Sequence, residues 1–206
     1  MDFAFNEEQD MLREQARSFL SNRFGDDRVA ELSESDEGWD PKAWAEVAEL
    51  GWLGLSAPES AGGSGMGFIE ETVIFEEMGR ALVPGPFFST VALCHPSLEK
   101  NEALLGLAVS GRATFTLAWA ESGGSVDLAD AARNDIRTKA EGSGDSATLS
   151  GEKILVPDLN CVDRVLVTAA GADGVGIWAI EKAAAEVTIL PTLDGTRRYG
   201  TLLLQG

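Results

Sequence analysis

The sequence contains very little of the chemistry that metal centres and histidine-based catalysis require. It has one histidine, His95, and two cysteines, Cys94 and Cys161, among 206 residues. The cysteines stand far apart without metal-ligand spacing, and His95, between Cys94 and a proline, has no partner pattern for a catalytic triad or a metal site. We therefore predict a structural histidine and two reduced packing cysteines in a cytoplasmic protein.

Positive charge is also scarce, because 16 basic residues stand against 34 acidic ones and the formal net charge is −18. Such a surface repels a phosphate backbone and an anionic membrane, so we expect neither nucleic acid nor membrane as a partner. No apolar run approaches the ~20 residues of a membrane span. Residues 1–8 lack the basic start and apolar core of a signal peptide, which again predicts a cytoplasmic protein.

The first half of the chain has the spacing and the end signals of helices. Asn6 and the pair Asp40-Pro41 are signals for a helix start, and apolar residues recur at helical spacing after each. Residues 68–82 and 98–109 predict further helices. The glycine cluster at 62–67 lacks the Lys-Ser/Thr of a nucleotide phosphate loop, so it predicts a tight connection between helices.

From Thr114 the apolar pattern changes from helical spacing to alternation, which predicts strands. Short alternating runs follow at 136–140, 147–150, 165–168, 176–180 and 187–190, with Gly-rich turns between several of them. Regularly spaced strands with such turns predict an antiparallel β-barrel or sandwich. The expected fold class is α+β, with an all-α helical domain at residues 1–111 and a β domain at residues 112–206.

Two segments of the second half carry candidate binding chemistry. Residues 114–127 begin as an alternating run and end in Glu121-Ser-Gly-Gly-Ser125, where backbone freedom and exposed N–H groups come together. A strand that runs into a small-residue turn brings main-chain donors to a flat or anionic ligand. The second segment is residues 150–158, Ser-Gly-Glu-Lys-Ile-Leu-Val-Pro-Asp.

Together these segments resemble signatures of the acyl-CoA dehydrogenase family. The first is similar to its Thr-Glu-Pro-x-x-Gly-Ser-Asp stretch and the second to its Gly-x-Lys-x-x-Ile-Thr stretch. Residues 58–65 resemble the Pro-Glu-x-x-Gly-Gly-x-Gly loop of its N-terminal helical domain, and residues 194–197 resemble its Asp-x-Thr-Arg pattern. The order, helices and then β structure, resembles the N-terminal and middle domains of the family, including its actinobacterial steroid-degradation subunits.

The resemblance implies that FAD is the cofactor and that main-chain groups of the two segments hold it. The implied FAD-binding positions are Leu117, Trp119, Ala120, Ser125, Val126, Leu155, Val156 and Pro157. The family's catalytic base is a glutamate in a C-terminal helical domain, which these residues do not include. No catalytic residue is therefore assigned: Glu121 matches the glutamate of the first motif, and that position is not the family's base.

Three positions depart from the family pattern in ways that weaken FAD binding. Ala120 stands in place of Thr, Val126 in place of Ser (with Ser125 one position earlier), and Pro157 in place of Thr. Proline has neither a hydroxyl nor an N–H to donate. Each lost hydrogen bond is worth ~1 kcal/mol, so three would lower the affinity ~100-fold.

Three functions remain open at this point. The first is an FAD-dependent acyl-CoA dehydrogenase of fatty acid or steroid catabolism, whose 206 residues alone are inactive. The second is a non-catalytic or flavin-poor partner subunit of a heteromeric acyl-CoA dehydrogenase, and the third is an interaction module without flavin. The resemblance implies an acyl-CoA substrate, an electron-transfer acceptor protein, and a homo- or hetero-oligomer with other acyl-CoA dehydrogenase subunits.

Overall fold

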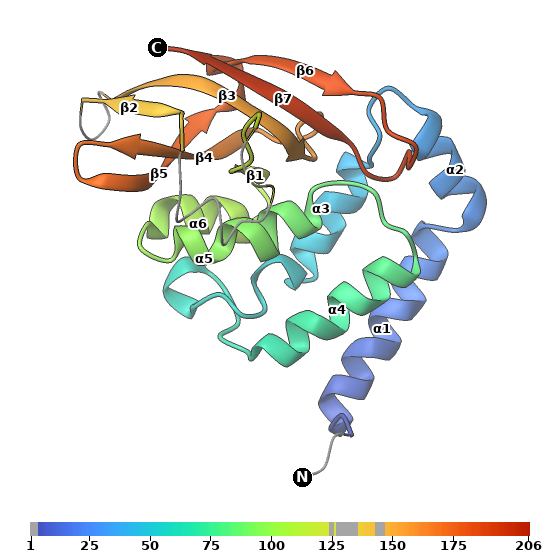
Figure 1. Cartoon of the computed structure of the whole chain (residues 1–206). Helices are drawn as coiled ribbons and strands as arrows, with labels where there is room; N and C mark the ends of the chain where they lie inside the picture. Colours follow the sequence, from blue (N-terminus) through green and yellow to red (C-terminus); the bar gives the residue numbers. More distant parts are fainter. Residues whose placement is uncertain (1–3, 124–125, 127–135, 143–146) are drawn as a thin grey trace.

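The computed structural model describes residues 4–123, 126, 136–142 and 147–206. Helices occupy the first half of the chain and a sheet occupies the second, with the sheet lying over the helices (Figure 1). The main helices are α1 (Glu7–Arg23), α2 (Asp26–Glu34), α3 (Pro41–Glu49), α4 (Phe68–Arg80), α5 (His95–Leu98) and α6 (Glu102–Val109). Shorter turns are η1 (Trp52–Gly54), η2 (Glu59–Ala61), η5 (Lys182–Ala184) and the π-helical η3 (Ser89–Cys94).

The predicted helix starts are formed as expected. The Asn6 side chain accepts from the backbone N–H of Gln9, whose side chain accepts in return from that of Asn6, which makes a capping box. Asp40 accepts from the first N–H groups of α3. The segment predicted as one helix at 98–109 is divided, because Asn101 caps a new helix through the N–H of Leu104.

The sheet contains seven strands in the described part of the chain: β1 (Phe115–Ala118), β2 (Lys139–Glu141), β3 (Thr148–Pro157), β4 (Arg164–Gly171), β5 (Gly174–Glu181), β6 (Glu186–Leu190) and β7 (Tyr199–Gln205). Their order is β1-β4-β2-β3-β7-β6, and β5 pairs with β4. The α+β class is confirmed. The sheet is mixed, because β1 and β2 both pair with β4 in parallel, and it is not closed into a barrel. Of the predicted antiparallel β-barrel or sandwich, the sheet that follows the helices is confirmed, whereas the all-antiparallel pairing and the closure are not found among the described strands.

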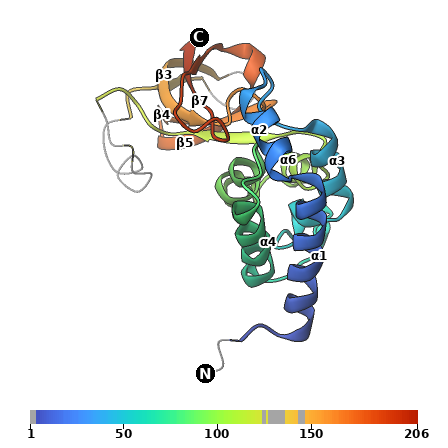
Figure 2. The same cartoon turned by 90° about the vertical axis from the view of Figure 1, so that its right-hand side faces the viewer.

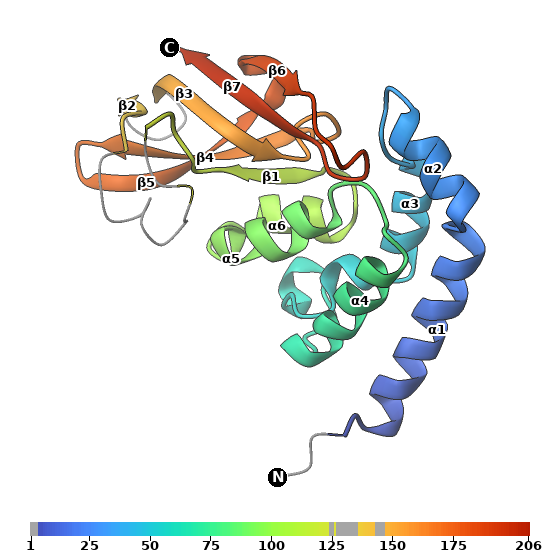
Figure 3. The same cartoon turned by 45° about the vertical axis from the view of Figure 1, so that its right-hand side comes forward.

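The helices and the sheet share one core (Figure 3). Phe115, Leu117 and Leu166 project from β1 and β4 onto Leu98 and Leu105 of α5 and α6. The opposite face of the sheet packs its own cluster, which includes Val156, Leu159, Val165, Val167 and Leu202. The sheet is therefore buried on both faces near β1 and β4, which explains the apolar runs of those strands.

The histidine and the two cysteines, which we predicted to have structural roles, are all buried. His95 is buried in α5, and burial lowers its pKa to about 4, so the ring is neutral at pH 7. Neither ring nitrogen has a hydrogen-bond partner among the described residues. Cys94 and Cys161 are both free and buried.

No described helix has the length and apolarity that crossing a bilayer would take.

Helices α1 and α4 run side by side (Figure 2). A buried carboxylate joins them. Glu77 of α4 is fully buried and accepts from Arg17 of α1 at 2.6 and 3.1 Å. Arg80 donates to the same carboxylate at 2.8 Å. The bond from Arg17 outweighs the effect of burial and holds the pKa of Glu77 at about 2, so the carboxylate is charged at neutral pH.

A second buried ion pair joins the two motif segments. The Lys153 ammonium on β3 has no exposed surface and lies 2.6 Å from Oε1 of Glu121. It also donates to Thr168 of β4 at 3.0 Å. The remaining capacity of Glu121 is filled by the N–H groups of Arg137 and Thr138 and by the Thr138 hydroxyl. Every polar atom of this network therefore has a partner, which a buried charge pair requires.

The protonation of this pair follows from its contacts. Burial alone would raise the pKa of Glu121, but the hydrogen bonds from Lys153 and Thr138 outweigh it and hold that pKa at about 2. Burial lowers the pKa of Lys153, and the Glu121 carboxylate opposes this. Gly151 allows the close approach behind the pair: its φ is +151°, and a Cβ there would lie 2.7 Å from the Cα of Thr138.

The buried carboxylate between α1 and α4 predicts a difference between two neighbouring glutamates. Glu77→Gln should lower the free energy of unfolding by about 1–3 kcal/mol, because charge-assisted bonds to Arg17 and Arg80 are lost. Glu76→Gln is the matched control: its side chain is 58% exposed and its ion pair in the described part of the chain is with Arg13, so we expect a loss below about 1 kcal/mol. Urea unfolding measures both. Equal losses would contradict the assignment.

The Lys153–Glu121 pair predicts a strong and non-additive effect on stability. Lys153→Met should cost about 3–5 kcal/mol, because it leaves a buried carboxylate without its cation. Lys153→Met with Glu121→Gln should cost less than the sum of the two single changes. Lys139→Met, on the exposed side of β2, is the control and should change stability by less than about 0.5 kcal/mol. Additive losses would show that the pair is not coupled.

The same pair predicts an acid dependence. The pKa of Glu121 is about 2 in the folded chain against 4.5 normally, so the unfolded chain takes up the proton first as pH falls. The contribution of the pair is complete above pH 4.5 and is lost as pH falls towards 2. The stability gap between the parent chain and the double variant should close over that interval in urea titrations. A gap independent of pH would contradict this.

Candidate functional site

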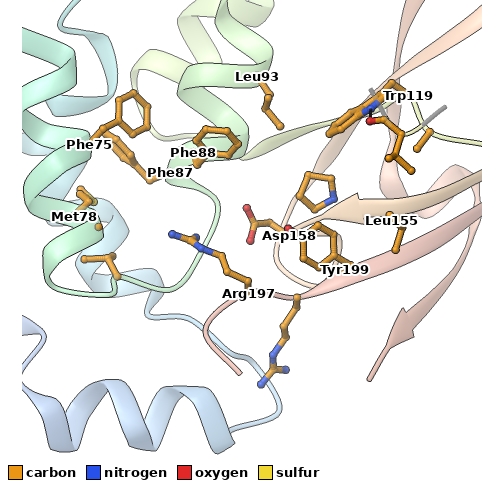
Figure 4. Close-up of a pocket in the computed structure, with 16 residues that line it drawn as sticks. Phe75, Met78, Phe87, Phe88, Leu93, Trp119, Leu155, Asp158, Arg197 and Tyr199 are labelled. Carbon is orange, nitrogen blue, oxygen red and sulfur yellow. Dashed lines mark hydrogen bonds between the residues drawn. The ribbon is translucent and has the colours of Figure 1, made fainter. Parts of the chain in front are cut away.

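A cavity of about 620 Å³ opens where α4 faces the ends of β1 and β3 (Figure 4). Its helical wall consists of Phe75, Met78 and Gly79 of α4, followed by Val83, Phe87, Phe88 and Leu93. Its sheet wall consists of Trp119, Ala120, Val126, Leu155, Pro157, Asp158, Arg197, Arg198 and Tyr199. The lining is mostly apolar, so the cavity suits a flat or extended apolar group with few polar anchors.

The cavity brings together five of the eight predicted FAD-binding positions. Trp119, Ala120 and Val126 come from the first motif segment, and Leu155 and Pro157 come from the second. Leu117 and Val156 lie elsewhere, with their side chains buried in the cores on opposite faces of the sheet. Ser125 lies outside the described residues. The predicted roles of Leu117 and Val156 are main-chain roles, which side-chain burial does not test.

The main chain fixes how the two motif segments meet. The N–H of Ile154 donates to the carbonyl of Ala120 at 2.9 Å, and the Trp119 indole donates to the carbonyl of Val126 at 2.9 Å. Beside this junction the register of β3 against β7 shifts between Lys153 and Val156. Leu155 in the shift has a φ of 50°, which an apolar residue rarely adopts. A strained residue in a bulge at a cavity wall is typical of a functional site.

The apolar alternation predicts a strand that includes Trp119 and Ala120. In the structure β1 ends at Ala118, so both residues lie just beyond it. The Lys153–Glu121 pair lies directly behind them, and the Lys153 ammonium approaches the carbonyl of Trp119 at 3.5 Å. These residues are therefore held by the backbone bond from Ile154 of β3 to Ala120 and by the contact of Lys153 with the Trp119 carbonyl. This arrangement leaves the side chains of Trp119 and Ala120 on the cavity wall.

Several lining residues were not singled out from the sequence. Asp158 ends the second segment, and its carboxyl is buried, accepting from the Ser89 hydroxyl at 2.5 Å. Burial raises the pKa of Asp158 to about 6, against the opposing effects of Ser89 and Arg197. Asp158 is the last residue of the second motif segment, and Arg197 is the last residue of the Asp-x-Thr-Arg pattern at 194–197. The sequence did not predict that both residues line the same cavity, because this depends on how the 192–198 turn folds back.

The 192–198 turn is fastened to the helical half. Arg198 donates to the carbonyl of Ser33 in the last turn of α2 and to those of Ser35 and Asp36 just after it, the last at 2.6 Å. The Asn160 side chain donates to the carbonyl of Glu37 at 2.8 Å. These bonds join the β half of the chain to the helical half beside the cavity. In the described part of the chain there is no cluster of His, Cys, Asp and Glu suited to a metal ion.

The polarity of the sheet wall is compatible with a flat aromatic ring such as that of a flavin. Trp119, Ala120, Leu155 and Pro157 present an apolar surface against which a flat ring can lie. Pro157 contributes no N–H, and its carbonyl already accepts from the Thr116 hydroxyl at 2.7 Å. Polar contacts to a ring would therefore come from other positions of the two segments.

Comparison with known proteins agrees with this architecture. Residues 6–101 match the acyl-CoA dehydrogenase N-terminal domain. Mitochondrial isovaleryl-CoA dehydrogenase of Bos taurus is 30% identical over 173 residues, which are 80% of this chain and 39% of that protein. The chain therefore spans less than half of the length of this relative.

Two solved structures extend the match across the sheet. A structure described as a Tcur3481-Tcur3483 steroid ACAD variant is 28% identical with a TM-score of 0.82, covering 97% of this chain and 55% of that one. The ChsE4-ChsE5 complex from Mycobacterium tuberculosis is 25% identical with a TM-score of 0.83, covering 100% of this chain and 56% of that one. From the domain match, these relatives and the shared fold, the chain belongs to the acyl-CoA dehydrogenase family.

Proposed function

We propose that this chain forms the FAD-facing and acyl-facing walls of an enzyme that removes two hydrogens across Cα–Cβ of an acyl-CoA thioester. In this proposal a helical domain at residues 1–111 supplies one wall and a β domain at residues 112–206 supplies the other. The observation that carries it is the cavity itself. Trp119, Ala120, Leu155 and Pro157, from two separate motif segments, form one apolar wall opposite Phe75 and Met78 of α4.

The chemistry divides between the chain and its cofactor. No side chain accepts a hydride, and FAD, when bound, accepts the one that leaves Cβ. The residues of this chain position the reactants: Trp119 and Leu155 would support the ring, and the α4 wall would exclude water from the apolar acyl group. Family resemblance places the base for the α-proton outside the matched domains. We therefore assign no catalytic residue and propose that these 206 residues alone have no turnover.

The partners follow from the same reaction. An acyl-CoA is the proposed substrate, and a separate electron-transfer protein is the proposed acceptor that reoxidises the flavin. Assembly with further acyl-CoA dehydrogenase subunits, identical or related, is proposed for the complete enzyme. A soluble, cytoplasmic location suits all of these partners.

A second candidate is a flavin-poor partner subunit of a heteromeric acyl-CoA dehydrogenase. Ala120 and Pro157 favour it, because each stands on the cavity wall where the family motif has a hydroxyl. The ChsE4-ChsE5 complex among the similar structures is itself an assembly of two named components. The two candidates differ in how tightly this chain holds FAD.

FAD binding by the chain tests the proposal. Quenching of flavin fluorescence on titration should reveal saturable binding, and Pro157→Thr and Ala120→Thr should each strengthen it about fivefold, since one regained hydrogen bond is worth ~1 kcal/mol. Pro191→Thr and Ala172→Thr, at exposed positions away from the cavity, are the matched controls and should change nothing. Absence of binding in all five proteins would reject the FAD-binding proposal and favour the partner-subunit function.

A further inference from the structure

Two polar side chains on the cavity wall have hydrogen-bonding capacity that the described residues do not use. The Asp158 carboxyl accepts from the Ser89 hydroxyl through Oδ2, and no described donor bonds to Oδ1. The carboxyl belongs to the cavity lining, and so does Arg197. Asp158 therefore has one acceptor atom without a donor among the described residues, at the wall of a mostly apolar cavity.

Arg197 supplies the complementary donors. Its Nη1 lies 3.4 Å from the carbonyl of Gly85, which is a long contact, and the described residues provide no acceptor for its Nε and Nη2. Figure 4 shows the Asp158 carboxyl and the Arg197 side chain on the same part of the cavity wall. They form no direct ion pair within the described structure, yet the charge of Arg197 opposes the rise in the pKa of Asp158. Because both groups line one cavity, a ligand there can contact both.

Both groups are held in place before any ligand arrives. The backbone N–H of Asp158 donates to the carbonyl of Arg198 at 2.8 Å, and Asp158 has a φ of 53°. The Ser89 bond fixes the carboxyl from the helical side. Asp194 fastens the turn that carries Arg197 through the N–H and hydroxyl of Thr196 at 2.8 and 2.7 Å. Such preorganisation is what a specific contact requires.

We propose that Asp158 and Arg197 recognise a hydroxyl group carried by an otherwise apolar ligand of this cavity. The hydroxyl donates to Oδ1 of Asp158 and its oxygen accepts from Arg197. The inference rests on the proposed function only for the identity of the ligand, which would be the acyl group of a hydroxylated acyl-CoA. A cavity that provides charged partners for a hydroxyl disfavours the analogue without it, because that analogue leaves both buried groups unpaired.

The test uses the 206-residue chain with two probes that differ by one hydroxyl, naphthalene and 2-naphthol. Isothermal titration calorimetry at pH 7.5 should give about tenfold tighter binding for 2-naphthol, which corresponds to about 1.4 kcal/mol. Arg197→Met keeps the apolar stem and removes the donors, and Asp158→Asn keeps the shape and removes the charge. Each should reduce the preference, read as the ratio of the two affinities, below about threefold.

The controls are Arg112→Met and Asp173→Asn, at exposed positions outside the cavity lining, which should keep the full preference. Equal affinity for the two probes in the parent chain would overturn the inference and leave the proposed apolar acyl cavity standing. A preference that persists in both cavity variants would also overturn it. Failure of both probes to bind would reject the inference together with the acyl-binding role of the cavity, whereas FAD binding is measured separately.

Discussion

The Lys153–Glu121 ion pair is the interaction on which the candidate site depends. Its two members come from the two motif segments, and both are buried where an isolated charge would be very unfavourable. Because Thr138 and Thr168 complete the network, the pair also ties β4 and the segment before β2 to the same point. The main chain at Trp119 and Ala120 leaves the sheet directly in front of this network. Burying the pair therefore fixes where the sheet wall of the cavity stands.

The opposite wall is fixed by a separate set of charges. Glu77 holds α4 against α1 through Arg17, and the same helix presents Phe75 and Met78 to the cavity. Arg198 links the turn after β6 to the segment after α2, so that the sheet and helical halves meet in a defined geometry. Charged residues with complete hydrogen bonding thus support the walls, while the surface offered to a ligand is apolar. Asp158 and Arg197 are the exceptions, since both keep unused capacity at the cavity.

The local features of the fold were predictable because they depend on short-range chemistry. The caps at Asn6 and Asp40, the helix at α4 and the change to strands after Thr114 all follow from neighbouring residues. Parallel pairing of β1 with β4 was not predictable, because it joins segments far apart in the chain. The motif resemblance indicated most of the sheet wall, but it did not distinguish side chains that face the cavity from those that face a core. Leu117 and Val156 are examples, since both belong to the motif segments but have side chains that face the cores. Asp158 and Arg197 come to line the same cavity through the fold of the 192–198 turn, and the spacing of apolar residues in the sequence does not predict that fold.

In the proposed site, the two motif segments together form the surface that holds FAD. Backbone amide chemical shifts of the isotopically labelled chain, followed during titration with FAD, would locate this surface. We expect the largest shifts at Trp119, Ala120, Leu155 and Val156, with smaller ones at Tyr199 and in α4. The amides of β5, which lie outside the cavity lining, should remain unchanged. Saturable shifts confined to another surface, or to only one of the two segments, would contradict the claim.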